Sequence, residues 1–455
     1  MTLPLRSRVA RFMRAFWVPL VLVAMALGYS GWTLHAHSHA LSPVDEWVYS
    51  DYLYKIGHGQ IPVQGEAIGH DALNLMACNG VKPYGPMGPP CGSDYSDLSK
   101  FPFAGITTAD AYTPAYFVVT ATIGNIFHAV GIDSLTSWRM TGPLWLGGTV
   151  FVMWMLMRRW RVPNLAILGL GLAFIASPFS WWTYTYVSTD APSVLFGALL
   201  LLLAHRYVQT GAGWWWIPLI SVLAVLFKVT NLLGVGLAAL YLIFAWLAEW
   251  PRRRWTGWRT ERLIAPGQRW LGLVVVAVTA AVLGVVTQLV WLRIHAAFGI
   301  GKVADQGIGY AFSKSELISQ IFNFLPGTLR ANVNISGSTA FALPLPDWSV
   351  FPLSWICITG VVGSIWTMTR GKQTNPLVVA VAIASAAFAP ALAVALYLTT
   401  GAYYQLPPRY GASILAGILL VSGLLLRNRL AQWVVIAYAL LLGGVLVAYL
   451  PVVGA

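Results

Sequence analysis

Apolar residues occur along this chain in long, nearly uninterrupted runs that short polar or basic segments separate. Each run of about 20 residues is long enough to cross roughly 30 Å of hydrocarbon as a helix. The pattern predicts eleven membrane-spanning helices, at about 16–34, 138–157, 163–182, 191–207, 214–229, 231–248, 270–292, 349–369, 376–399, 410–426 and 431–451. Another apolar stretch, about 113–130, is interrupted by polar residues and glycine, and predicts an amphipathic helix on the membrane surface.

The composition is typical of a membrane protein. Hydrophobic residues make up 58% of the 455 residues and charged residues 9%, and the mean hydropathy is +0.68. Soluble domains do not have this composition. We therefore predict an all-α polytopic membrane protein in which residues 1–455 form a single transmembrane domain.

The basic residues predict the orientation, because cytoplasmic loops carry an excess of Lys and Arg. Arginines precede the first run at 6–14, and further basic clusters follow at 158–161, 252–269, 370–372 and 427–429. All of them fall on one side of the predicted helices. We therefore place the N-terminus in the cytoplasm and the protein in a bacterial plasma membrane as a multi-pass protein.

The first apolar run and the net charge each allow a different interpretation. The first run could be a cleaved signal peptide, because Ala36 and Ala40 are small residues near a suitable cleavage site. The net charge of +13 could also indicate nucleic acid. Because the positive charge follows the topology, we interpret it as a topology signal, with attraction to anionic membrane lipids as a secondary effect, and nucleic acid is not expected as a partner.

Two long loops fall on the outer side of these helices, at 35–137 and 293–348. The first contains Cys78 and Cys91, which would lie in an oxidising compartment. They predict a disulfide, with two free thiols as the alternative. Cys357 lies within a predicted helix and is interpreted as a small packing residue.

Two adjacent carboxylates, Asp45 and Glu46, follow the first predicted helix. Only 15 residues of the chain are acidic. A charge near hydrocarbon is costly to desolvate and persists where it has a partner or a task. Neighbouring residues of a helix point about 100° apart, so only one of the pair can readily face a shared site. The alternative is a structural role at a helix start, with Asp45 as the cap and Glu46 favouring the N-terminal helix dipole.

Three more charged residues lie at predicted helix ends. Asp190 precedes a helix near Pro192 and could be an N-cap. Lys228 lies in an otherwise apolar stretch, where it needs an anionic partner or must extend to the membrane surface. Arg409 stands between a double proline and a new helix, well placed for a bidentate contact with a phosphate. An interfacial anchor is the alternative for Arg409.

The order of these residues resembles that in the GT-C superfamily of membrane glycosyltransferases, which use polyprenyl-phosphate sugars. In that family an acidic pair opens the first outer loop, a surface helix follows, and an Arg opens the second spanning helix. Later come an Asp before a Pro- or Ala-rich helix, a Lys, and an Arg-Tyr pair before an apolar helix. The matching positions here are Asp45-Glu46, Thr113-Pro114-Ala115-Tyr116-Phe117, Arg139, Asp190, Lys228 and Arg409-Tyr410. The proline that usually follows Arg-Tyr is absent.

The resemblance implies a GT-C-like helical bundle and a sugar transfer with inversion. The donor would be a polyprenyl-phosphate sugar and the acceptor an extracytoplasmic lipid or polysaccharide glycan. Asp45 would act as general base, with Glu46 and Asp190 as further catalytic residues. The lipid phosphate of the donor would be bound by four residues, Lys228, Arg409, Tyr410 and Arg139.

Aromatic residues near the same surface offer faces on which a sugar could stack, with the ordinary interfacial aromatic belt as the alternative. They are Trp181, Trp182, Tyr184, Tyr186, Tyr403 and Tyr404.

No cofactor is required by these residues. A divalent cation stays open, because Glu66, His70 and Asp71 have a helical spacing and three histidines alternate at 35–39. The glycines around the first set favour solvated loops.

The alternative function is a transporter or flippase of a lipid-linked glycan or its precursor. It predicts internal repeats and charges at mid-membrane depth, and the sequence shows neither. A non-catalytic assembly subunit would leave the charged residues at the helix ends unexplained.

Overall fold

The computed structural model of the protein describes residues 5–36, 39–42, 45–82, 84–254, 271–302, 312–331, 345–369, 372–401, 403 and 406–454. These residues form helices and connecting segments, and the β pairing among them is limited to isolated bridges. The prediction of an all-α fold is confirmed. Four predicted features, His37, Tyr404, Arg370 and the basic residues at 255–269, lie outside the described residues.

Nine helical segments in the described part of the chain are long and apolar enough to cross a membrane. They lie in α1 (Leu5–Ala36), α5 (Ser134–Arg139) with α6 (Thr141–Arg159), α9 (Ser193–Thr210), η3 (Val229–Asn231) with α11 (Leu232–Arg254), α12 (Leu271–Phe298), α15 (Asp347–Trp366), α16 (Asn375–Thr400), η6 (Pro408–Gly411) with α17 (Ala412–Leu425), and α18 (Arg429–Gly454). The protein is therefore a multi-pass membrane protein.

The predicted crossing at 163–182 is not one straight helix. It consists of α7 (Asn164–Ile175) and α8 (Pro178–Thr185), which are bent by 60° and together provide a tenth crossing if they count as one span. Ser177 caps α8, because its hydroxyl accepts a hydrogen bond from Ser180 N at 3.2 Å, and Pro178 occupies the first turn. Both features start a new helix where the sequence pattern predicts a continuous one.

The predicted crossing at 214–229 corresponds to α10 (Trp216–Phe227), which has 12 residues. A helix of this length extends only about 18 Å, so α10 is shorter than the other spans. It ends at Lys228, whose backbone is extended, with φ of −162°. The described residues thus show nine or ten spans where the sequence pattern predicts eleven.

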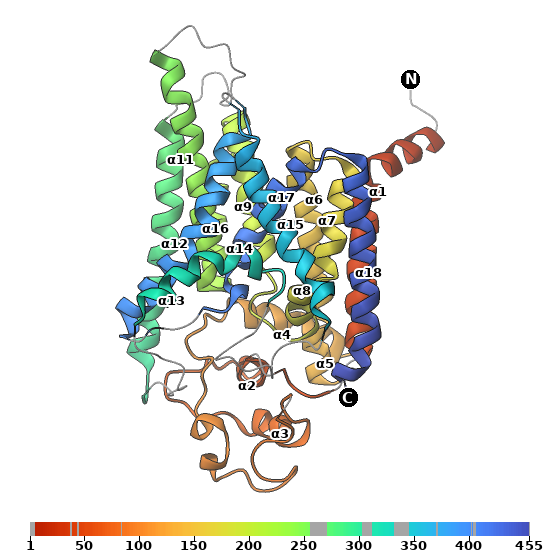
Figure 1. The fold of residues 1–455 in the computed structure, drawn as a ribbon. Helices are drawn as coiled ribbons and strands as arrows, with labels where there is room; N and C mark the ends of the chain where they lie inside the picture. Colours follow the sequence, from red (N-terminus) through yellow and green to blue (C-terminus); the bar gives the residue numbers. More distant parts are fainter. Residues whose placement is uncertain are drawn as a thin grey trace.

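Figure 1 shows the first loop as a layer across one end of the bundle, whereas the N-terminal end of α1 lies at the other. The layer contains α2 (Glu46–Gly57), α3 (His70–Cys78), η1 (Leu98–Lys100), η2 (Pro102–Gly105), α4 (Ala115–His128) and α5. Helix α4 coincides with the surface helix predicted at 113–130 and exposes apolar side chains such as Ile126, at 65%.

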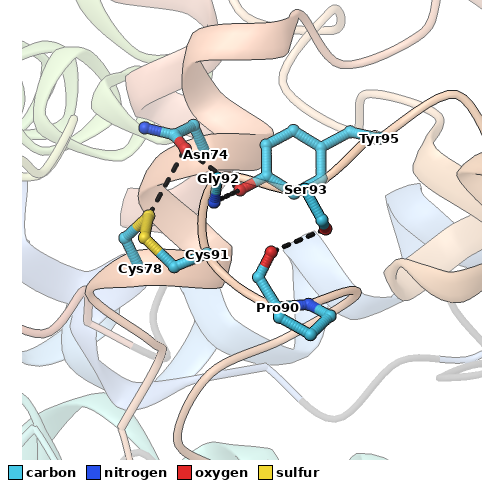
Figure 2. The surroundings of a disulfide bond; sticks show 7 residues. All are labelled: Asn74, Cys78, Pro90, Cys91, Gly92, Ser93 and Tyr95. Atoms are coloured by element: carbon cyan, nitrogen blue, oxygen red, sulfur yellow. Dashed lines mark hydrogen bonds between the residues drawn. A yellow bond between two sulfur atoms is a disulfide. The ribbon is translucent and has the colours of Figure 1, made fainter.

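The loop between α3 and the rest of this layer is closed by a disulfide between Cys78 and Cys91, the predicted pair. Figure 2 shows the contacts around it. The Tyr95 hydroxyl donates to Asn74 Oδ1 at 3.0 Å and accepts from Gly92 N at 2.7 Å. These contacts attach the cystine loop to α3, because Asn74 lies on that helix.

The second loop is shorter than predicted, because α12 continues to Phe298 and reaches the first loop. Trp291 Nε1 donates to Ala111 O at 2.9 Å, and His295 Nε2 lies 2.8 Å from Asp110 Oδ2. The described part of the loop then forms α13 (Lys314–Ser319), η4 (Gln320–Phe322) and α14 (Phe324–Gly327). The end of α12 therefore ties the two loops together.

Close packing of α9 against α17 fixes the geometry of the site. A Cβ atom at Gly197 of α9 would collide with the carbonyl oxygen of Ser413 in α17, so glycine alone permits this approach. Asp190 lies just before α9 and Arg409 just before α17. The contact between the two helices thus holds the segments that carry these charges side by side.

Candidate functional site

Four of the charged residues singled out from the sequence form one network. Lys228 Nζ donates to Asp190 Oδ1 at 2.6 Å, and Arg409 Nη1 donates to Asp190 Oδ2 at 3.1 Å. Arg409 Nη2 donates to Asp45 Oδ2 at 3.0 Å. Two cations therefore alternate with two carboxylates, and Arg409 links the two acids.

The network lies where several helices begin or end. Asp190 and Arg409 precede α9 and α17, Asp45 precedes α2, and Lys228 ends α10. Helix α9 leads away from the network and α10 returns to it, because Lys228 and Asp190 are in contact. Buried charges at such a depth require partners, and each of these residues supplies one to another.

Asp45 is the accessible member of the network. Its side chain is 39% exposed, against 9% for Arg409 and 1% for Asp190, and the Lys228 side chain is 2% exposed. Asp45 Oδ1 accepts no hydrogen bond within the described part of the chain. A substrate can therefore reach the Asp45 carboxylate more easily than the other charges.

The backbone of Asp45 is strained. Its φ of 62° and ψ of −7° lie in the left-handed region, which costs a non-glycine residue about 1–3 kcal/mol, although Asp tolerates it better than most. Asp45 occupies the N-cap position of α2, yet its side chain caps no backbone N–H group. The capping interpretation of Asp45 is therefore wrong, and the conformation directs its carboxylate to Arg409.

Glu46 is turned to a different partner. Its carboxylate is fully buried and bonds to Arg139 through both oxygens, at 2.8 Å from Nε and 2.7 Å from Nη2. The backbone N–H groups of Ser42 and Val187 donate to the same two oxygens. Glu46 lies in the first turn of α2, where an acidic residue favours the helix dipole, but it is not accessible to a substrate, so its interpretation as a catalytic residue is a poor fit to the geometry.

Arg139 is equally enclosed. The residue is 2% exposed, and its guanidinium carbon lies 5.0 Å from the ring centre of Tyr186. One Nη2 hydrogen bond goes to Ala40 O at 2.8 Å. Because its charge is matched by Glu46, Arg139 holds the start of α2 against α5 and is not free to bind a phosphate.

Asp190, Lys228 and Arg409 are buried ion-pair partners and not caps or surface residues. The Asp190 side chain bonds to Lys228 and Arg409 and caps no helix. Lys228 is 3% exposed and ion-paired, so it does not extend to the membrane surface. Arg409 is 7% exposed, which is inconsistent with an interfacial anchor.

Tyr410 contributes its ring to the cations of the network. Lys228 Nζ lies 5.4 Å from the ring centre, and the guanidinium carbon of Arg409 lies 5.7 Å from it. The ring face thus stabilises both positive charges. Tyr410 supports the two cations and holds them at the end of α10.

Tyr49 is a member of the site that the sequence interpretation missed. Its hydroxyl lies 3.4 Å from Asp45 Oδ2 and 3.2 Å from Thr189 Oγ1. Burial raises the pKa of Tyr49 well above its usual value, and the nearby Tyr112 and Asp45 add to the shift. The phenol therefore stays protonated as a donor. The spacing of four residues on one helix face is a signal that could have identified it.

A narrow hollow of about 10 Å³, with room for about one water molecule, lies beside Arg409 and Asp190. It is lined by Ser42, Trp182, Thr183, Tyr186, Val187, Ser188, Asp190, Ala331 and Arg409. Arg409 Nε is buried and has no hydrogen-bond partner in the described part of the chain. A ligand with an acceptor oxygen could satisfy this donor.

The described site residues do not fit a metal ion. No group of three or more His, Cys, Asp or Glu side chains in the described ranges has a suitable arrangement. Both oxygens of Asp190 are taken by cations, and Glu66 bonds to Lys55 at 3.1 Å. Helix α3 begins at His70, so Glu66 does not share a helix with His70 and Asp71.

No protein-family model and no curated protein sequence matches the chain. The crystal structure of ArnT from Cupriavidus metallidurans bound to undecaprenyl phosphate matches with a TM-score of 0.51 and 17% identity. The match covers 92% of this chain and 61% of the ArnT chain, so this chain spans less than two thirds of the length of ArnT.

The protein has a GT-C fold. The fold predicted from the order of Asp45-Glu46, Asp190, Lys228 and Arg409-Tyr410 is thereby confirmed. Two structures of the oligosaccharyltransferase of Archaeoglobus fulgidus also match with TM-scores of 0.45, at 14% and 13% identity. They are the complex with Zn and sulfate, covering 96% of this chain and 52% of theirs, and the form tethered to an acceptor peptide, covering 98% and 55%.

Within this GT-C fold, the charge network and the basic cluster at 158–161 lie at opposite ends of α6. Arg139, which bonds to Glu46 near the network, comes just before α6, and the cluster begins in its last turn. The 19 residues of α6 separate them by about 28 Å, roughly the thickness of the hydrocarbon core. The site and the basic cluster therefore face opposite sides of the bundle.

Proposed function

We propose that the protein is an inverting glycosyltransferase that moves a sugar from a polyprenyl-phosphate donor to a hydroxyl group of a lipid or polysaccharide acceptor. One observation carries the proposal: the exposed carboxylate of Asp45 is bonded to Arg409, a buried cation with an unpartnered N–H group in the described part of the chain. A base and a phosphate-binding cation are thus adjacent at one end of a membrane bundle. The GT-C fold supports this interpretation.

Asp45 acts as the general base in this proposal. Its carboxylate takes the proton of the acceptor hydroxyl as the hydroxyl oxygen attacks the anomeric carbon of the donor. The bond between that carbon and the phosphate oxygen breaks, and its electron pair stays on the phosphate. A single displacement of this kind inverts the anomeric centre.

Arg409 stabilises the charge that grows on the departing phosphate. Lys228 is too deeply buried to reach the substrate directly, and its ammonium group bonds to Asp190. Asp190 in turn orients Arg409 through Nη1. Lys228, Asp190 and Tyr410 are thus positioning residues for Arg409, and Arg139 and Glu46 position the start of α2.

The proposed location is a bacterial plasma membrane, with the active site on its outer side. The basic cluster at 158–161 lies at the end of α6 away from the site, and such clusters stay in the cytoplasm. Donor and acceptor would then meet at the outer leaflet, where Asp45 is accessible.

A reconstitution experiment tests the function. Lipid and glycan extracts from a strain lacking the gene should contain both the unused donor and the unmodified acceptor. Purified protein in proteoliposomes should release polyprenyl phosphate from that extract and extend the acceptor by one sugar, which mass spectrometry detects. Movement of an intact lipid-linked glycan across the vesicle membrane, without its cleavage, would instead indicate a flippase and contradict the proposal.

The Tyr49→Phe substitution should lower kcat about tenfold, because it removes one hydrogen bond to a charged group, and leave the KM for the donor unchanged. The ring, which packs against Phe117 with centroids 5.5 Å apart, is retained. Steady-state kinetics of polyprenyl-phosphate release measure the effect.

Tyr52→Phe is the matched control for this substitution. Tyr52 lies on the same helix and donates to Tyr112 O, away from Asp45. An equal loss in both variants would show that the hydroxyl of Tyr49 has no particular role in positioning Asp45.

A further inference from the structure

The first outer loop contains a larger pocket, which lies between α2 and α3. Its volume is about 410 Å³, within the range of about 300–1,000 Å³ that is typical of small-molecule sites. Helix α3 packs against α2, and α2 packs against α4. Figure 1 shows α2 between α3 and the helical bundle, so the pocket lies away from the hydrocarbon. Neither the charge network nor the proposed transfer reaction uses this pocket.

Three charged residues form the floor of this pocket. Lys55 Nζ bonds to Asp51 Oδ2 at 3.0 Å, to Glu66 Oε1 at 3.1 Å and to Ala67 O at 2.7 Å. Gly69 N donates to the other oxygen of Asp51 at 2.8 Å. The side chains of Asp51 and Lys55 are 0% and 9% exposed. The ammonium group therefore has three acceptors, and these bonds fix the floor of the pocket without a ligand.

The rim of the pocket carries polar side chains that a ligand can reach. The side chains of His70 and Asp71 are 74% and 58% exposed, and His58 and Gln60 are exposed as well. Burial raises the pKa of Tyr54, which also lines the pocket, and nearby carboxylates add to the shift. The Tyr54 hydroxyl therefore stays protonated and can donate a hydrogen bond.

An uncharged sugar matches the chemistry of this pocket. Tyr54 and Gln60 offer donors and Asp71 offers acceptors, and each sugar hydroxyl can both donate and accept. The lining contains three carboxylates and one ammonium group, a net charge of −2 with both histidines neutral, which repels a phosphate. A prenyl chain would leave the polar groups unsatisfied. The pocket therefore favours a sugar over either part of a lipid phosphate.

The pocket and the proposed base lie on different sides of the same helix. Asp51 is six residues after Asp45, which is about 9 Å along the axis of α2. Tyr49, whose hydroxyl contacts Asp45, and Asp51 are two residues apart and point about 200° away from each other. A single sugar cannot contact both places, whereas a chain of several sugars can.

We propose that the pocket binds an uncharged sugar unit of the acceptor glycan, several units away from the hydroxyl that receives the new sugar. The proposal rests on the function proposed above. It narrows the acceptor to a glycan that is long enough to extend from the pocket to Asp45.

Binding of oligosaccharides to the purified protein in nanodiscs tests the pocket. The probes are uncharged tetrasaccharides of glucose, mannose, galactose and arabinose, and tetragalacturonic acid is their anionic counterpart. Isothermal titration calorimetry measures the affinity for each probe. At least one uncharged probe should bind roughly tenfold more tightly than the anionic probe, because the carboxylates of the pocket repel a negative charge.

Two substitutions on the rim should weaken the binding of that probe. Asp71→Ala should weaken it roughly tenfold and Tyr54→Phe roughly fivefold, as expected for the loss of a charged and of a neutral hydrogen-bond partner. Tyr54→Phe keeps the ring contact with Trp138, whose centroid is 4.9 Å away. Asp97→Ala is the matched control for Asp71→Ala, because Asp97 is a carboxylate of the same loop, 50% exposed, that does not line the pocket.

A transfer reaction tests whether the bound glycan is an acceptor. Proteoliposomes that receive the donor from the extract of the deletion strain should extend the bound probe by one sugar. The Asp71→Ala substitution should raise the KM for this probe, because the substitution weakens its binding in the pocket.

The possible failures distinguish the pocket from the proposed function. Unchanged binding in both rim variants, a preference for the anionic probe, or no binding of any probe would overturn the sugar pocket. The proposed function would stand in each case if the natural acceptor is still extended. A probe that binds but is not extended, while the natural acceptor is, would overturn the acceptor role of the pocket. Absence of transfer to any acceptor, with binding in the pocket intact, would overturn the proposed function and the acceptor role with it.

Discussion

Asp45→Asn should abolish sugar transfer while the protein still folds. The amide retains an oxygen that can accept the Arg409 hydrogen bond, now 3.0 Å long, but it cannot take a proton from the acceptor. Loss of a general base lowers the rate by about 10²–10⁴-fold. The rate of polyprenyl-phosphate release in proteoliposomes measures the effect, and size-exclusion chromatography with thermal unfolding reports the fold.

Asp97→Asn is the matched control for this substitution. Asp97 is an accessible carboxylate of the same loop, with a side chain that is 50% exposed and lies 3.4 Å from Lys100. It should keep the wild-type rate. Turnover within a few-fold of the wild type in Asp45→Asn would show that Asp45 is not the base.

The members of the charge network could be identified from the sequence, because a charged residue within an apolar stretch is costly and needs a partner. In an apolar helix, Lys228 requires an anion, and scarce carboxylates at helix ends are the available partners. The prediction did not include how they pair. Asp190 bonds to both Lys228 and Arg409, which lie 38 and 219 residues away in the sequence, and no local pattern encodes contacts of that range.

The sequence predicted that Asp45 and Glu46 face different partners, but not the partner of each residue. Adjacent residues on a helix point in different directions, so one of the pair was expected to face away from the site. Which one does so depends on Arg139, 93 residues from Glu46. It also depends on the left-handed backbone conformation of Asp45. Glycine is the usual sequence signal of that conformation, and position 45 is not a glycine.

The sequence pattern failed where helices break. The apolar run at 163–182 carries no polar interruption strong enough to predict the bend between α7 and α8, although Ser177-Pro178 is a typical helix start. Trp182, in α8 after the bend, lines the hollow. The aromatic residues of this region could be counted from the sequence, but burial alone distinguishes Trp182 from Trp181, Tyr184 and Tyr186.

Glu46→Gln should destabilise the protein strongly. The change leaves the Arg139 guanidinium buried, at 2% exposure, without a counter-charge. Removal of one partner from a buried ion pair costs about 3–5 kcal/mol. The melting temperature of the purified protein in detergent should therefore fall, and less folded protein should be recovered from membranes. Any loss of activity should match the loss of folded protein.

The double substitution Glu46→Gln with Arg139→Met separates structure from catalysis. It removes both charges, so no buried cation is left without a counter-charge, and the glutamine keeps an oxygen that can accept from Ser42 N or Val187 N. We expect the melting temperature to recover and the rate per folded molecule to return towards that of the wild type, because Asp45 and Arg409 are untouched. A stable double variant without activity would show that Glu46 takes part in the reaction. In that case the hydrogen bonds that Ser42 N and Val187 N donate to Glu46 would position a catalytic carboxylate as well as the start of α2.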